Sequence, residues 1–148
     1  MSSILDLVVA LSSNDNTVRR QAEEAFNHTK TTNPVQLVSS LTELLLQCDQ
    51  EQIRAFSAVL LRRLLEGKAG LWEQLDVGTQ TATKQILLQA IQQEPKAHVR
   101  RKLGHTVSQL VHAIVSKTGD LNSWPELLPF VLALFQRPEH QQRENALD

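Results

Sequence analysis

Apolar residues along the chain recur at the spacing of amphipathic helices, and polar, glycine or proline residues separate these stretches. The first two helices are predicted over residues 3–12 and 16–30, and the run SSNDN between them supplies N-cap residues for the second. A third helix is predicted over residues 34–47, because Asn33 can cap it and Pro34 is tolerated at the first helical position.

The helical pattern continues to the end of the chain. Asp49 is predicted to cap a fourth helix, and Gly67 and Gly70 are predicted to end it. The fourth helix is thus predicted over residues 50–66. The segment GKAGLWEQLDVG that follows it is predicted as a loop whose Leu71 and Trp72 pack on the helices. The later helices are predicted over residues 79–93, 96–117, 125–136 and from about 139 onward.

A two-residue motif recurs near the start of every second helix. The pairs are Val18-Arg19, Ile53-Arg54, Val99-Arg100 and Gln142-Arg143, and four residues after each first member stand Ala22, Ser57, Leu103 and Ala146. Successive copies are 35, 46 and 43 residues apart, which is typical of the two-helix repeats of the HEAT and armadillo class. The sequence therefore predicts an all-α fold, a right-handed α-solenoid of about four HEAT repeats built from antiparallel helix pairs, the last one truncated. The approximate repeats are residues 1–31, 33–67, 78–118 and 124–148.

The motif has a structural interpretation. One helix pair cannot bury its apolar face alone, so the aliphatic residue and the residue four places later are expected in the seam between stacked pairs. The arginine lies about 100° round the helix, at the edge of that seam. There it can donate hydrogen bonds to carbonyl or carboxylate oxygens of the neighbouring repeat. This inter-repeat role is predicted for Arg19, Arg54, Arg100 and Arg143.

The last residues, QQRENALD, stop inside a predicted helix without a stop signal. Repeat arrays end in a polar capping repeat. We therefore expect the chain to be either the N-terminal piece of a longer solenoid or a deliberately truncated form.

Charge and cysteine content narrow the function classes. The formal net charge of −1 gives no general reason to bind nucleic acid or a membrane. Residues 1–50 carry three basic and six acidic side chains, whereas residues 51–103 carry nine basic and five acidic ones. That local excess of positive charge fits a solvated helix face or a partner surface. The single cysteine, Cys48, excludes an intramolecular disulfide, and no apolar run reaches the 18 residues of a membrane span.

The sequence contains no recognisable catalytic or metal-binding pattern. His105 and His112 are seven residues apart, too far for the i, i+4 pair of a zinc helix, and Cys48 has no adjacent basic partner. The chain contains no glycine-rich phosphate loop and no GxSxG nucleophile motif. We expect no enzyme activity, no catalytic residue, no metal and no cofactor.

Small residues on the second helices are a more informative feature. Ala55, Ala58, Gly104 and Ser108 are predicted to form a shallow floor between three arginines, which are Arg20, Arg62 and Arg101. A glycine inside a helix costs about 1 kcal/mol relative to alanine. Gly104 is therefore expected to accommodate the close approach of either a neighbouring helix or a bound partner.

Three segments carry a resemblance to a known family. NDNTVRRQAEEAF, IRAFSAVLLRRLL and SWPELLPFV resemble the first HEAT repeats of the importin β superfamily of nuclear transport receptors, and the importin five class most. The most specific element is AFSAVLLRRLL followed about 60 residues later by SWPELL, and the similarity spans the whole chain.

The resemblance implies a docking function. In this family the second helices of the N-terminal repeats bind the GTP form of the small GTPase Ran, which displaces import cargo in the nucleus. It also implies cargo proteins with basic nuclear localisation signals and nucleoporins as partners of later repeats, and shuttling between cytoplasm and nucleus. Carried over by helix face, the candidate Ran-binding residues are Arg20, Glu23, Glu24, Asn27, Arg62, Arg101, His105 and Ser108. The alternative is a generic HEAT-repeat scaffold that takes no part in nuclear transport.

Overall fold

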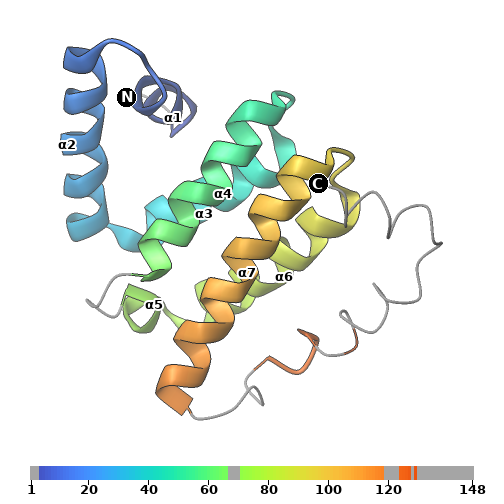
Figure 1. Ribbon diagram of the computed structural model, residues 1–148. Helices are drawn as coiled ribbons and strands as arrows, with labels where there is room; N and C mark the ends of the chain where they lie inside the picture. The colour runs from blue at the N-terminus through green and yellow to red at the C-terminus, as the bar shows by residue number, and fades with distance from the viewer. Residues whose placement is uncertain (1–3, 67–70, 119–123, 128, 130–148) are drawn as a thin grey trace.

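The computed structural model describes residues 4–66, 71–118, 124–127 and 129, and within these residues it contains seven helices and no strand (Figure 1). The all-α prediction is thereby confirmed. The helices are α1 (Ile4–Leu11), α2 (Asn16–Thr32), α3 (Pro34–Gln47), α4 (Glu51–Glu66), α5 (Leu71–Gln74), α6 (Val77–Gln93) and α7 (Ala97–Thr118).

Short polar side chains set the starts of two helices as predicted. Asp15 Oδ1 accepts hydrogen bonds from the backbone N–H groups of Thr17 at 2.8 Å and Val18 at 3.3 Å. Asn33 Oδ1 accepts from Gln36 N at 3.2 Å, and α3 begins at the proline that follows Asn33. Both side chains satisfy backbone donors that the first turn of a helix leaves unpaired.

Two other helix starts differ from the prediction. Helix α4 begins at Glu51, and the carbonyl of Gln50 accepts from Arg54 N, so Gln50 rather than Asp49 is the N-cap residue. Helix α6 begins earlier than expected because Asp76 caps it, accepting from Thr79 N at 3.1 Å and from Thr79 Oγ1 at 2.6 Å. These hydrogen bonds lower the pKa of the Asp76 carboxyl, because they favour its charged form.

The segment before α6 was expected to be a loop, and it contains the short helix α5. Leu71 and Trp72 are both buried, as predicted. Gln80 Nε2 of α6 donates to the Trp72 carbonyl at 2.8 Å, and the ammonium group of Lys84 lies 5.9 Å from the Trp72 ring centroid. The predicted stop at Gly67 and Gly70 lies outside the described residues.

The helices stack as pairs. Helix α3 packs on α4 and α6 on α7, and the two pairs lie side by side through contacts of α3 with α6 and of α4 with α7 (Figure 1). Their shared core is almost fully excluded from solvent and is mainly leucine: Leu37, Leu41, Leu61, Leu64, Leu87, Leu103 and Leu110. At the α4–α7 contact, the buried hydroxyl of Thr106 donates to the carbonyl of Ala58 at 2.8 Å. This close approach of the two helices is the seam that the repeat predicts.

The first pair sits differently. Helix α2 packs on α1 and α3 rather than along α4, and Figure 1 shows it standing away from the other long helices. Consequently Val18 is 40% exposed, whereas the matching Ile53 and Val99 are 6% and 0% exposed. The prediction that this motif position faces a seam is wrong for Val18, because no parallel second helix covers it.

Candidate partner-binding surface and repeat joints

The motif arginines share one contact that the sequence did not reveal. In each of three repeats, Nη1 of the arginine donates to the carbonyl oxygen six residues earlier. The pairs are Arg19 to Ser13 at 3.2 Å, Arg54 to Cys48 at 2.8 Å and Arg100 to Glu94 at 2.8 Å. Cys48 and Glu94 are the C-cap residues of α3 and α6. The motif arginine therefore ties the second helix of a pair to the end of the first, where carbonyl groups lack helical partners.

Arg54 also reaches the next repeat. Its Nε lies 2.7 Å from Glu94 Oε1 and its Nη2 lies 2.9 Å from Glu94 Oε2, a bidentate ion pair. The two side chains are only 12% and 2% exposed. The hydrogen bonding that Arg54 donates to the Glu94 carboxylate is the main cause that raises the pKa of Arg54 above its ordinary value. We call this pair the Arg54–Glu94 clamp.

Two other members of the predicted set, Arg19 and Arg100, make hydrogen bonds within their own helix pairs. The hydrogen bond of Arg100 to the Glu94 carbonyl stays inside its own helix pair, as does that of Arg19, whose Nη2 also donates to Asn16 Oδ1. Arg143 lies outside the described residues, so its role stays a prediction.

The eight candidate Ran-binding residues fall on three helices. Exposed on α2 are Arg20, Glu23, Glu24 and Asn27, and exposed on α7 are Arg101, His105 and Ser108. Figure 1 shows the α3–α4 pair between α2 and α7, so these seven residues form two separate groups. The eighth residue, Arg62 of α4, is half-buried, and its Nε is buried without an acceptor in the part of the chain that the structure describes.

Three exposed residues of α7 were missing from that set. His98, Lys102 and His112 stand on the same open side of the helix as Arg101 and His105. We call these five residues the basic stripe of α7. The signal was present in the sequence, since His98, His105 and His112 follow one another at seven-residue spacing and α7 contains no carboxylate.

Gly104 occupies an open position. A β-carbon built on it would meet no atom within 4 Å among the described residues. The neighbouring helix that could have explained this glycine is therefore not found among these residues. We predict that Gly104→Ala raises the free energy of unfolding by about 1 kcal/mol, because alanine restricts the unfolded chain and favours the helix. Urea unfolding followed by circular dichroism measures this change, and a loss of stability would show that the position is occupied.

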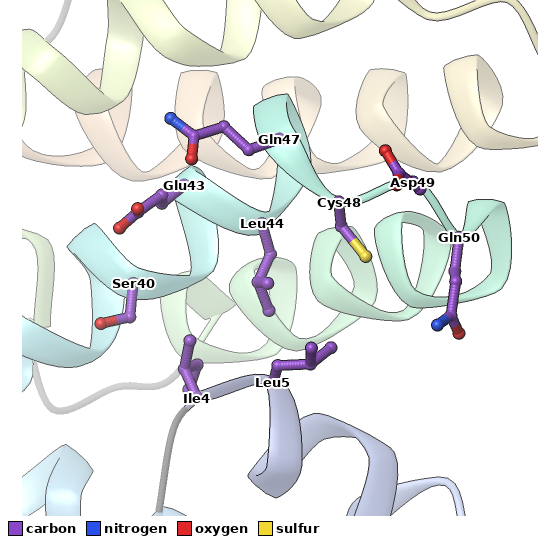
Figure 2. A pocket seen from close by; sticks show the side chains of 9 residues that line it. All are labelled: Ile4, Leu5, Ser40, Glu43, Leu44, Gln47, Cys48, Asp49 and Gln50. Carbon is purple, nitrogen blue, oxygen red and sulfur yellow. The ribbon is translucent and has the colours of Figure 1, made fainter.

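A cavity of about 520 Å³ lies between α1 and the corner that joins α3 to α4 (Figure 2). Ile4 and Leu5 line one side of it and Leu44 and Cys48 the other, and the rest of the lining is polar: Ser40, Glu43, Gln47, Asp49 and Gln50. The lining includes the carboxylates Glu43 and Asp49 and contains no histidine or lysine. Ser40 Oγ accepts a hydrogen bond from Gln36 Nε2 at 3.1 Å.

The described residues show neither a metal cluster nor a membrane-spanning helix. No cluster of three or more histidine, cysteine or carboxylate side chains suitable for a metal ion occurs in the described ranges. Within those ranges, too, no helix combines the length and apolar character needed to cross a membrane.

Comparison with known proteins agrees with the stacked helix pairs. The family model described as "IPO5-like, TPR repeats" matches residues 95–148. The chain is 31% identical over 148 residues to "Probable importin-5 homolog" of Dictyostelium discoideum, covering 99% of this chain and 14% of that protein. It is 33% identical over 108 residues to "Importin-4" of Homo sapiens, covering 73% of this chain and 9% of that protein. The chain thus spans about a seventh of the first relative, and the matched segment includes all of the described helices. Together with the all-α repeat architecture, these similarities show that the chain belongs to the importin β family and is importin-5-like.

Proposed function

We propose that this chain forms the N-terminal part of a nuclear import receptor and binds Ran-GTP through the second helices of its repeats, α2, α4 and α7. The observation that carries the proposal is the similarity to an importin-5 homolog along 99% of the chain, across the same stacked helix pairs. Binding here couples cargo release to the nucleus, whereas cargo and nucleoporins are contacted by later repeats. The receptor shuttles between cytoplasm and nucleus.

The surface chemistry of the second helices supports a protein partner. Helix α2 exposes Glu23 and Glu24 beside Arg20, and α7 exposes the basic stripe. A partner with charges of both signs can be oriented by two such groups, because complementary charges mainly fix the register of docking and speed association. Few of these side chains are committed to contacts inside the described chain.

Arg62 differs from the other candidate residues because its side chain is half-buried. Among the described residues its buried Nε has no acceptor, and a buried donor without a partner is costly. A carboxylate or carbonyl of a bound partner would satisfy it. We therefore expect Arg62 to contribute more to binding than an exposed arginine on the rim of an interface.

The test measures binding of the purified chain to Ran loaded with a non-hydrolysable GTP analogue and, in parallel, to Ran-GDP, at two salt concentrations. We expect selective binding of the GTP form, weakened at least tenfold by Arg62→Glu or Arg101→Glu. The matched control is Gln89→Glu, which adds negative charge at an exposed position of α6, the first helix of its pair. This variant should leave binding unchanged.

Two outcomes would contradict the proposal. Equal binding of Ran-GTP and Ran-GDP would remove the coupling to nuclear release. If neither form binds the folded chain, or a longer chain that includes later repeats, a HEAT-repeat scaffold outside nuclear transport becomes the better explanation.

A further inference from the structure

The third helix pair has an unusual charge distribution. Between Val77 and Thr118 the chain carries six lysine or arginine residues and one carboxylate, Glu94. That carboxylate is buried and paired with Arg54, so it does not offset the charge at the surface. The five residues of the basic stripe are all exposed and run along α7 from His98 to His112. The field along this side of α7 is therefore positive.

The helices packed on α7 do little to neutralise the stripe. Helix α6 contains no carboxylate. From α4, Glu51 Oε2 lies 3.3 Å from His98 Nε2 at the first turn of α7, in a pair that is largely open to solvent. Within the described residues, no ion pair reaches Lys102, His105 or His112. The permanent positive charge of the stripe, on Arg101 and Lys102, is therefore not paired with a described carboxylate.

The repeat itself indicates that this side of α7 stays open. Residues of α4 and α7 correspond at an offset of 46, as Ile53 and Val99 show. Ala58 of α4 is fully buried under α7, and its counterpart is Gly104, so a following repeat would pack on the Gly104 side of α7. The α4 counterparts of His98 and His112 are Gln52 and Glu66, which remain exposed although α7 covers the other side of α4, whereas those of Arg101, Lys102 and His105 are Ala55, Phe56 and Val59, which are half-buried. A following repeat would therefore leave both ends of the stripe exposed and its middle partly accessible.

We propose that the basic stripe of α7 docks an acidic segment of a protein partner. The proposal deepens the proposed function and rests on it in one respect, since Arg101 and His105 belong to the candidate Ran-binding surface. Seven-residue spacing places His98, His105 and His112 in one line along the helix, which suits a partner segment that lies along α7. Complementary charge then fixes the orientation of that segment.

A protein segment fits the stripe better than a nucleic acid. Only Arg101 and Lys102 of the stripe carry a permanent charge, and the five residues include no phenylalanine, tyrosine or tryptophan. Nucleic-acid binding depends on neutralising many phosphates, typically with further aromatic stacking for single strands. A short patch with three histidines instead favours a compact acidic surface.

The test uses a fluorescent glutamate-rich helical peptide as the probe and follows its anisotropy with the whole chain. Two comparison probes are used. One is a basic peptide with as many charges as the acidic peptide, and the other is a single-stranded RNA oligonucleotide with the same negative charge as the acidic peptide. We expect binding of the acidic peptide that weakens with salt and falls at least tenfold in Lys102→Glu/His105→Glu. Lys30→Glu on α2, a charge reversal outside the candidate surface, is the control and should change binding less than twofold.

The outcomes separate this inference from the proposed function. No binding of the acidic peptide, equal loss in Lys30→Glu, or tighter binding of the RNA would overturn the inference. If Ran-GTP binds and its affinity is unchanged in Lys102→Glu/His105→Glu, the inference fails for Ran while the proposed function stands. Stripe-dependent binding of the peptide without any binding of Ran-GTP would support the inference and reject the proposed function. Circular dichroism of each variant shows that it is folded, and the neutral variant Lys102→Gln/His105→Gln gives a milder second measurement.

Discussion

Replacing Glu94 by alanine lowers the free energy of unfolding by about 3–5 kcal/mol, the range for removal of one partner from a buried ion pair. The substitution leaves Arg54, whose side chain is 12% exposed in the intact pair, without the carboxylate that accepts two of its hydrogen bonds. It also removes the acceptor of the Lys96 backbone N–H. Urea unfolding of the whole chain, followed by circular dichroism at 222 nm, measures the loss.

Two further variants show whether the buried pair is responsible. Glu51→Gln removes the partner of His98 in a pair that is largely exposed, and it should change stability by about 1 kcal/mol or less. In Arg54→Met/Glu94→Leu both charges are replaced by apolar groups, so part of the lost stability should return. A loss below about 1 kcal/mol for Glu94→Ala would mean that the clamp does not join the second and third repeats.

The second large effect is expected at the motif position of the third repeat. Val99→Ala should destabilise the chain by about 2–3 kcal/mol, because the side chain is fully buried at the α4–α7 seam and its loss leaves a cavity. Val18→Ala makes the same chemical change at the same motif position of the first repeat. Since Val18 is 40% exposed, its loss should stay within about 0.5 kcal/mol.

Denaturant unfolding of the two valine variants under identical conditions measures both values. The comparison is internally controlled, because sequence motif and substitution are shared and only the packing differs. Equal losses would show that Val18 is covered to the same extent as Val99, and that α2 lies along α4 as a regular stack requires.

Local features were predictable from the sequence. The caps at Asp15 and Asn33 depend on residues within three positions, and the helix boundaries depend on the apolar period, so both could be found before the structure. The cap at Asp76 has the same local origin, but the first turn of α6 contains Gly78 and reads as part of the preceding loop.

Long-range features were not predictable in the same way. The motif predicted that Arg54 reaches the next repeat, but nothing in the sequence singled out Glu94, 40 residues away, as its partner. The exposure of Val18 depends on where α2 packs, which its own residues do not determine. Likewise the candidate surface was assigned by helix face, which says nothing about the half-buried state of Arg62 or the separation of α2 from α7. The stripe on α7 could have been found from its histidine spacing.

The clamp also has a mechanical consequence. In the second and third repeats Arg54 joins one pair to the C-cap of the next, whereas the C-cap that Arg19 would meet in the second repeat is Cys48, whose thiol offers no charge to a guanidinium. We therefore expect the joint between the second and third pairs to resist bending more than the joint between the first and second pairs.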